Sequence, residues 1–284
     1  MRRIDFSVDS SYDGRRVLAL LRAHGLSSRI IRSLKQIPDG ILLNGSHIRT
    51  VDIIHAGDTL TVNLPDDNSA AQPSDIPLDV IYTDDDILVV NKPAGLAMHP
   101  THNHQGDTLA NAEAEYFSRQ GKTVVFRAVG RLDKCTSGVV ILALNAFVAS
   151  KLSGALTKTY FAVCEGELSG SGIINKPIIR PDPIKTVRST GEDGLPAVTA
   201  WTALRSSNGR TLVKVEPLTG RTHQIRVHFA SIGHPLAGDD MYGSSDTAIG
   251  RAALHCGCVR LEHPVTGETM EFNAPLPDDM AKLI

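Results

Sequence analysis

Apolar positions in the first 64 residues follow a helical spacing before they change to strand-like runs. In GRRVLALLRAHGL (residues 14–26) the apolar side chains recur on one helical face, and Gly25 follows as a stop signal. Ser27 and Ser28 can cap a second helix, which we expect to end near Ile37, just before a proline. The pattern therefore predicts two short helices near the amino terminus.

Turn signals separate the strands that we expect after these helices. GILLNGSHIRT places Asn44–Gly45 between two apolar runs, which is the pattern of a β-hairpin, and AGDTLTVNLP supplies another strand. Two helices and three short strands predict a small α/β module over residues 1–64. Residues 65–77 are polar, contain three prolines and lack periodicity, which is typical of a linker.

From residue 78 onward strands predominate, with helices between some of them. Apolar runs predict strands in LDVIYTDDDILVVNKPAG, TKTYFAVCEGEL, LPAVTAWTAL and RTLVKVEPL. DTLANAEAEYFSRQG predicts an amphipathic helix capped by Asp107, and LNAFVASKLSGAL predicts one capped by Asn145. We expect residues 78–284 to form an α+β domain on a mainly antiparallel mixed sheet with flanking helices and loops.

Composition narrows the class of protein. The chain has 284 residues, of which 42% are hydrophobic and 21% charged, so it can bury a real core in one or two domains. No run approaches the roughly 18 apolar residues of a membrane span, and the first residues lack the apolar stretch of a signal peptide. The four cysteines contain no CxxC pair, which disfavours zinc and favours reduced thiols. We expect a cytoplasmic protein, with a monomer as the default.

Charge is distributed unevenly along the chain. A net charge of −2 argues against a uniformly basic nucleic-acid binder, yet residues 14–50 hold seven cations against the single acid Asp39. Such asymmetry is typical of a module that meets polyanions. A solvated helix face is the alternative. The hairpin and the missing acids favour RNA binding, with candidate contacts at Arg15, Arg16, Arg29, Arg32 and Lys35.

An ionisable run leads directly into a very apolar one in VGRLDKCTSGVVILALN (residues 129–145). Arg131 and Lys134 flank Asp133 and favour its charged form. Small polar residues then indicate a tight turn, and residues 139–144 indicate a buried strand. A carboxylate on a loop anchored by a core strand is a common way to present a functional group. A surface ion pair at a strand end is the alternative, and this stretch alone does not decide between them.

A second constellation occurs in EPLTGRTHQIRVHFASIGHPLAGDDMYG (residues 216–243), and it permits three interpretations. A metal could be bound by the three histidines, but their spacing matches no helical zinc motif. The polar groups could be structural. Alternatively, the arginines could bind phosphates or a carboxylate. The residues concerned are Arg221, His223, Arg226, His228 and His234.

Four segments in a fixed order carry a resemblance to a known family. VVNKPAGLAMHP, GRLDKCTSGVVILA, TKTYFAVCEG and GRTHQIRVHFASIGHPLAGDDMYG together resemble the RluA-type RNA pseudouridine synthases over about residues 78–275. The amino-terminal module more loosely resembles the S-four-type RNA-binding domain. Two positions depart from the family pattern: Gly130 stands where histidine is usual, and Cys135 stands where Asp or Glu is usual.

The resemblance implies catalytic roles for three residues. Asp133 corresponds to the carboxylate that acts at ribose C1′, either as a nucleophile or as the base that starts glycal formation. Arg221 corresponds to the basic residue that pairs with this carboxylate. Tyr160 corresponds to the residue that stacks on the base and is a candidate for proton removal at C5, although a purely core role is the alternative.

The resemblance also implies the substrate and its contacts. Ile225 corresponds to an apolar residue of the uracil pocket, which Leu132 and His223 are expected to join. Arg131 corresponds to a residue that can enter the RNA where the target is flipped out, unless it is merely structural. The reaction implies no metal and no cofactor. The expected partner is structured RNA, with ribosomal RNA favoured over transfer RNA. A catalytically weak RNA-binding or ribosome-assembly protein is the alternative.

Overall fold

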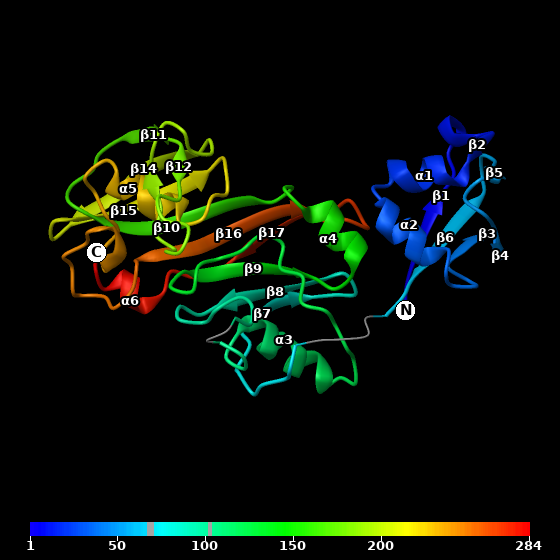
Figure 1. Cartoon of the computed structure of the whole chain (residues 1–284), viewed down its shortest axis with the longest axis horizontal. Coiled ribbons are helices and arrows are strands. Elements are labelled where there is room, and N and C mark those ends of the chain that lie inside the picture. The colour runs from blue at the N-terminus through cyan, green and yellow to red at the C-terminus, as the bar shows by residue number, and fades with distance from the viewer. Residues whose placement is uncertain (67–70, 102–103) are drawn as a thin grey trace.

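The computed structural model describes residues 1–66, 71–101 and 104–284, in which two sheets organise the chain (Figure 1). A four-stranded sheet lies at the amino-terminal end, and a nine-stranded sheet forms the body of the molecule. Among these residues no helix is both long and apolar enough to cross a membrane.

The amino-terminal elements follow the predicted pattern closely. Ser27 caps the second helix by accepting the Ile30 N–H at 3.3 Å, but that helix ends at Leu34, earlier than the sequence suggested. Asn44 and Gly45 both adopt positive φ at the hairpin turn, as such turns require. The elements are β1 (Arg2–Ser7), η1 (Ser10–Tyr12), β2 (Arg15–Arg16), α1 (Val17–Ala23), α2 (Ser28–Leu34), β3 (Ile41–Leu43), β4 (Ser46–His47), β5 (Ile53–Ile54) and β6 (Thr59–Leu64).

The large sheet has the strand order β11-β14-β15-β10-β16-β9-β8-β7, with β17 added beside β16. Among its described strands the only parallel pair is β9 with β16, so the expectation of an α+β fold on a mainly antiparallel mixed sheet is confirmed. The strands are β7 (Val80–Thr83), β8 (Ile87–Lys92), β9 (Ser137–Ala143), β10 (Thr157–Glu165), β11 (Ser171–Asn175), β14 (Val198–Ser207), β15 (Arg210–Pro217), β16 (Leu254–Glu262) and β17 (Thr269–Asn273).

Short helices flank this sheet. Asn145 caps α4 as predicted, because its side chain accepts the Val148 N–H at 3.0 Å. The cap of α3 is Thr108, which forms a capping box with Asn111, whereas Asp107 contacts His104 instead. The remaining elements are α3 (Leu109–Ser118), α4 (Ala146–Leu152), β12 (Ile178–Ile179), β13 (Ser189–Thr190), α5 (Gln224–Ala230), η2 (Asp240–Tyr242) and α6 (Asp278–Ala281).

The amino-terminal elements lie against α4 and the β7–β8 turn (Figure 1). Arg2 makes a bidentate contact with the buried carboxylate of Asp86, at 2.7 and 3.0 Å, and the Phe6 ring meets Phe147 edge-on. The predicted linker, residues 65–77, has no helix or strand among its described residues, while residues 67–70 lie outside them. The boundaries of the two predicted domains stay a proposal.

Candidate active site

Asp133 lies on a tight loop that leads into β9, a strand whose seven residues are all buried. The Asp133 carbonyl accepts the Thr136 N–H at 3.0 Å and closes the turn. Gly138 fixes the loop against β16, since it has a φ of +115° and a Cβ there would lie 2.2 Å from the Cys256 carbonyl oxygen. Only glycine fits such an approach, so the backbone places Asp133 at one spot beside the large sheet.

A buried lysine holds the same loop from its other side. Lys92, at the end of β8, is fully buried and donates to the carbonyls of Pro93 and Leu96, both at 2.9 Å. It also donates to the Lys134 carbonyl at 3.4 Å, which the Gly95 N–H bonds as well, at 2.8 Å. Burial lowers the pKa of Lys92 to about 8. The residue after Asp133 is therefore tied to the preceding strand.

The Asp133 carboxylate faces an arginine that is itself held in place. The nearest Arg226 nitrogen, Nη1, lies 3.9 Å from Asp133 Oδ2, while Nε and Nη2 bind Asp239 at 2.7 and 2.6 Å. The guanidinium also lies over the Tyr242 ring. Burial alone would lower the pKa of Arg226, but the bond to Asp239 and the nearby carboxylates raise it above its usual value. Asp133 thus has a permanent cation beside it.

His223 is the second neighbour of this carboxylate. Its Nε2 lies 3.9 Å from Asp133 Oδ2, and its Nδ1 lies 2.7 Å from the Tyr242 hydroxyl. That hydroxyl accepts the Arg188 N–H, so its own proton is free to bond Nδ1. Burial lowers the pKa of His223, which favours a neutral imidazole with its proton on Nε2, facing Asp133. His223 adopts a left-handed φ of 57° to take this position.

Arg221 does not pair with Asp133 as we expected from the family resemblance. Its Nε donates to the Pro196 carbonyl at 3.1 Å, and its N–H donates to Gln224 Oε1 at 3.0 Å. The reason is local: Arg221 precedes α5, whereas Arg226 lies within that helix, where every residue before the last is buried. Arg226 therefore lies beside Asp133, where the family resemblance led us to expect Arg221.

The predicted catalytic and substrate-binding residues nevertheless gather around one cleft of about 460 Å³. Leu132 and Ile225 are buried in its wall, and Arg131 is exposed. Arg226, one of the two arginines that the sequence suggested could bind a carboxylate, also lines it, as does Lys158, which was assigned no role from the sequence. The predicted residues lining the cleft are Arg131, Leu132, Asp133, Tyr160, Arg221, His223 and Ile225.

Tyr160 belongs to both the core and the cleft. It lies on β10 opposite Cys256 of β16, is largely buried, and still forms part of the cleft wall. Burial, and to a smaller degree the nearby Cys256 and Asp133, raise the pKa of Tyr160 well above its usual value. Its phenol therefore stays neutral at neutral pH, and its ring offers a flat apolar surface beside the carboxylate.

The three histidines considered as metal ligands do not act together. His228 bonds Thr199 through Nδ1 and the Lys176 carbonyl through Nε2, at 2.8 and 2.9 Å. His234 bonds the Glu165 carbonyl through Nδ1 at 2.8 Å. Of the three, His223 alone faces the cleft carboxylate. His228 and His234 bond groups of the protein itself and therefore have structural roles.

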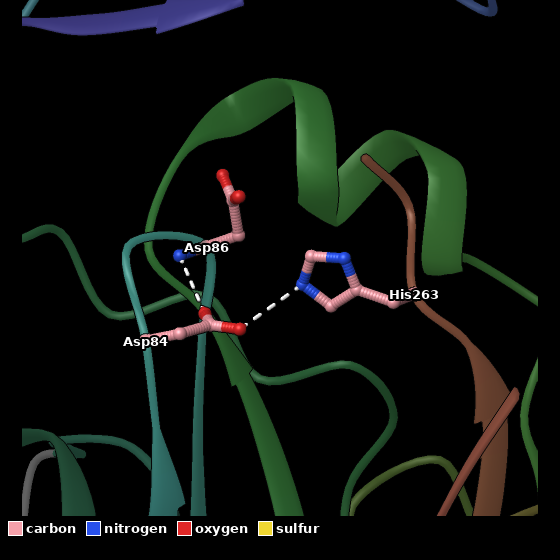
Figure 2. Close-up of side chains that lie close together, drawn as sticks. All are labelled: Asp84, Asp86 and His263. Atoms are coloured by element: carbon pink, nitrogen blue, oxygen red, sulfur yellow. Dashed lines mark hydrogen bonds and ion pairs between the residues drawn. The ribbon is translucent and has the colours of Figure 1, made fainter. Parts of the chain in front are cut away.

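Another group of side chains has the size of a metal site. Ligand atoms of Asp84, Asp86 and His263 lie within 4.8 Å of one another (Figure 2). His263 Nε2 lies 3.1 Å from Asp84 Oδ2, at ion-pair distance but without good hydrogen-bond alignment. The carboxylate of Asp86 is already bound by Arg2 and Asn145.

The chemistry of this group fits a structural junction better than a cation site. His263 Nδ1 accepts the Thr266 N–H at 3.2 Å, so in the neutral ring the proton sits on Nε2, toward Asp84. A cation would have to displace that proton and compete with Arg2 for Asp86. These contacts join β1, the β7–β8 turn and the loop after β16.

Comparisons with known proteins agree with the fold. A family model described as RNA pseudouridylate synthase matches residues 86–231. The uncharacterized RNA pseudouridine synthase YjbO of Bacillus subtilis (strain 168) is 36% identical over 271 residues, covering 92% of this chain and 95% of the relative. The ribosomal large subunit pseudouridine synthase D of Salmonella typhimurium is 38% identical over 238 residues, covering 77% of this chain and 73% of the relative.

A solved structure shows the same architecture. The structure titled Human RNA Pseudouridylate Synthase Domain Containing 1 superposes with a TM-score of 0.56 at 28% identity, over 70% of this chain and 83% of that one. The fold is thus that of an RNA-modifying isomerase. The chain belongs to the RNA pseudouridine synthase family, and its resemblance to the RluA-type enzymes is confirmed.

Proposed function

We propose that this enzyme isomerises uridines of ribosomal RNA and that Asp133 is its catalytic carboxylate. The ribosomal substrate is supported by the relative named for the large ribosomal subunit. The role of Asp133 is supported chiefly by one observation: its partly exposed carboxylate enters the cleft with Arg226 and His223 beside it. A carboxylate with fixed cations beside it in a cleft of ligand size is a candidate functional group.

The reaction breaks the bond from uracil N1 to ribose C1′ and joins C1′ to C5 of the same base. Atoms are conserved and no redox change occurs. Asp133 either attacks C1′ or removes a ribose proton to form a glycal, and both routes require an ionised carboxylate. Arg226 and the Nε2–H of His223 are the donors nearest to this carboxylate, each 3.9 Å from its Oδ2.

The cleft wall supplies the contacts for the base. Tyr160 presents its ring as a stacking surface, with Leu132 and Ile225 as apolar neighbours. The uridine must leave its helix to reach Asp133, and the exposed Arg131 side chain is available to fill the vacated space. Tyr160 is also the candidate for proton transfer at C5. Because its pKa is raised, the tyrosinate would be a strong base, but only a small fraction of the side chain is ionised at neutral pH.

Residues 1–64 are proposed to be an S-four-like RNA-binding module that adds affinity and no chemistry. Its candidate RNA contacts are all exposed, so their charges are open to the solvent and to an approaching polyanion. We further propose a monomer that works in the cytoplasm. These contacts are Arg15, Arg16, Arg29, Arg32 and Lys35.

The test is to incubate the protein with total cellular RNA and map new pseudouridines. Wild-type protein should modify ribosomal RNA, whereas Asp133→Asn should bind RNA within several-fold of wild type and modify none. Turnover by the variant above about 1% of wild type would contradict the role of Asp133. New pseudouridine confined to transfer RNA would contradict the substrate, and none at all would favour a non-catalytic RNA-binding protein.

A further inference from the structure

Lys158 is one of four cations on the cleft wall, together with Arg131, Arg221 and Arg226, and the reaction as proposed does not use it. It lies on β10 two residues before Tyr160, so the two side chains lie on the same face of the strand. Both line the cleft that contains Asp133. The strand separates them by about 7 Å along its length.

The ammonium of Lys158 has no anion to pair with among the residues that the structure describes. No described residue makes a hydrogen bond or ion pair with it, and its electrostatic neighbour is the thiol of Cys256. Arg226, by contrast, is bound by Asp239, and Arg221 bonds the Pro196 carbonyl. Burial lowers the pKa of Lys158, because the charged ammonium is partly removed from water. An anionic ligand beside the ammonium would offset this desolvation free energy.

Gly130 makes room for this ammonium. A Cβ at Gly130 would stand 3.0 Å from Lys158 Nζ, and the φ of +79° there also favours glycine. Because Gly130 lies three residues before Asp133, Lys158 Nζ is next to the loop that carries the proposed catalytic carboxylate.

We propose that Lys158 binds a phosphate group that flanks the target uridine. The inference rests on the proposed function, because phosphates are the only anionic groups of an RNA substrate. With the base on Tyr160 and the ribose at Asp133, a flanking phosphate can reach the Lys158 ammonium. Lys158 is then a substrate-binding residue that fixes the ribose over the carboxylate. The alternative is a lysine whose alkyl chain covers apolar surface while its ammonium faces water.

The test compares Lys158→Met and Lys158→Gln with Lys122→Met, which removes an exposed lysine outside the cleft. RNA affinity is measured at several salt concentrations, in the wild-type chain and again in Asp133→Asn, so that binding is read without turnover. Each Lys158 variant should weaken binding by about tenfold and make the slope of log affinity against log salt shallower by about one. Lys122→Met should leave both unchanged, and Lys158→Arg should restore the slope.

The outcomes separate this inference from the proposed function. If both Lys158 variants melt at the wild-type temperature and keep wild-type affinity and salt slope, the ammonium only faces water and the inference is overturned. A fall in kcat with KM and slope unchanged would also overturn it, because the residue would then act on the chemistry and not on a phosphate. If the slope changes as expected while Asp133→Asn remains active, the phosphate contact stands and the role of Asp133 falls.

Discussion

At the scale of single residues, the site depends on which groups are already occupied by other protein contacts. Arg226 uses two nitrogens on Asp239 and leaves the third toward Asp133. Arg221 lines the same cleft but bonds backbone and amide groups near α5. The arginine that is fixed by a buried carboxylate is therefore the better partner for Asp133, since its orientation does not have to be established when substrate binds.

The first prediction contrasts these two arginines. Arg226→Lys keeps a cation for Asp239 but loses the bidentate geometry, so turnover should fall by at least about a hundredfold while the protein stays folded. Arg226→Ala should fall further and also lose about 3–5 kcal/mol of stability, because Asp239 is left buried without a partner. Single-turnover rates and melting curves check both. Equal effects of Arg221→Ala and Arg226→Lys on turnover would refute the reassignment.

The second prediction concerns the group formed by Asp84, Asp86 and His263. Because Arg2 and Asn145 already bind Asp86, we expect turnover to persist in excess EDTA once any magnesium needed for RNA folding is supplied. Elemental analysis of the purified active protein gives the independent measurement. Stoichiometric zinc, with loss of turnover on its removal, is the result that contradicts metal independence.

At the scale of elements, the ends of β8 and β9 define the position of the proposed catalytic loop. Lys92 joins them by donating to carbonyls on both sides. Its pKa of about 8 lies below the usual 10.5, so the unfolded chain binds more protons between these pH values. The free energy of unfolding therefore gains a contribution as the pH rises from about 8 toward 10.5.

The third prediction follows from this sign. Lys92→Met removes the side-chain donor from the part-buried Pro93 and Leu96 carbonyls, at about 1–3 kcal/mol each, while the Lys134 carbonyl keeps the Gly95 N–H. The variant should be less stable at pH 7, and the gap to wild type should widen by pH 9.5. Urea unfolding at both pH values measures it. If the difference in unfolding free energy between wild type and variant narrows as the pH rises, burial does not lower the pKa of Lys92.

The elements themselves were largely predictable, because their signals are local. The cap at Asn145, the hairpin at Asn44–Gly45 and the buried strand after Asp133 all depend on residues a few positions apart. The sequence indicated that Arg221 and Arg226 could bind a carboxylate, but it did not predict which of them lies beside Asp133. Arg226 reaches that carboxylate only after α5 packs against η2 and its guanidinium binds Asp239. The predicted cap of α3 was wrong for a simpler reason. Asp107 and Thr108 are adjacent and both are good cap residues, so the sequence alone does not show which of them caps the helix.

At the scale of the whole molecule, the amino-terminal elements are docked and not merely tethered. Arg2 binds Asp86, and the ring of Phe6 packs between His24 and Phe147. The linker composition gave no hint of this interface, because the contacts join residues more than eighty positions apart. If residues 1–64 bind RNA, the docking presents their cations in a fixed direction relative to the cleft.

The docking changes how the contribution of this region should be measured. Deleting residues 1–70 should still leave a protein that modifies RNA with a raised KM, but the deletion also uncovers Asp86 and Phe147. Substituting exposed cations of α2 and its carboxyl-terminal cap leaves those contacts in place. The sharper variant is therefore Arg29→Gln combined with Arg32→Gln and Lys35→Gln.

The fourth prediction is that this triple variant binds RNA more weakly and with a salt slope shallower by two or more, because each lost phosphate contact removes one counterion-release contribution. Its kcat should stay at the wild-type value, since none of the three residues lines the cleft. Exchanging Lys122, Arg205 and Lys282 for glutamine removes three exposed cations elsewhere on the protein and serves as the matched control. If both triple variants change the slope equally, the effect reflects net charge alone, and the α2 surface is only a solvated helix face.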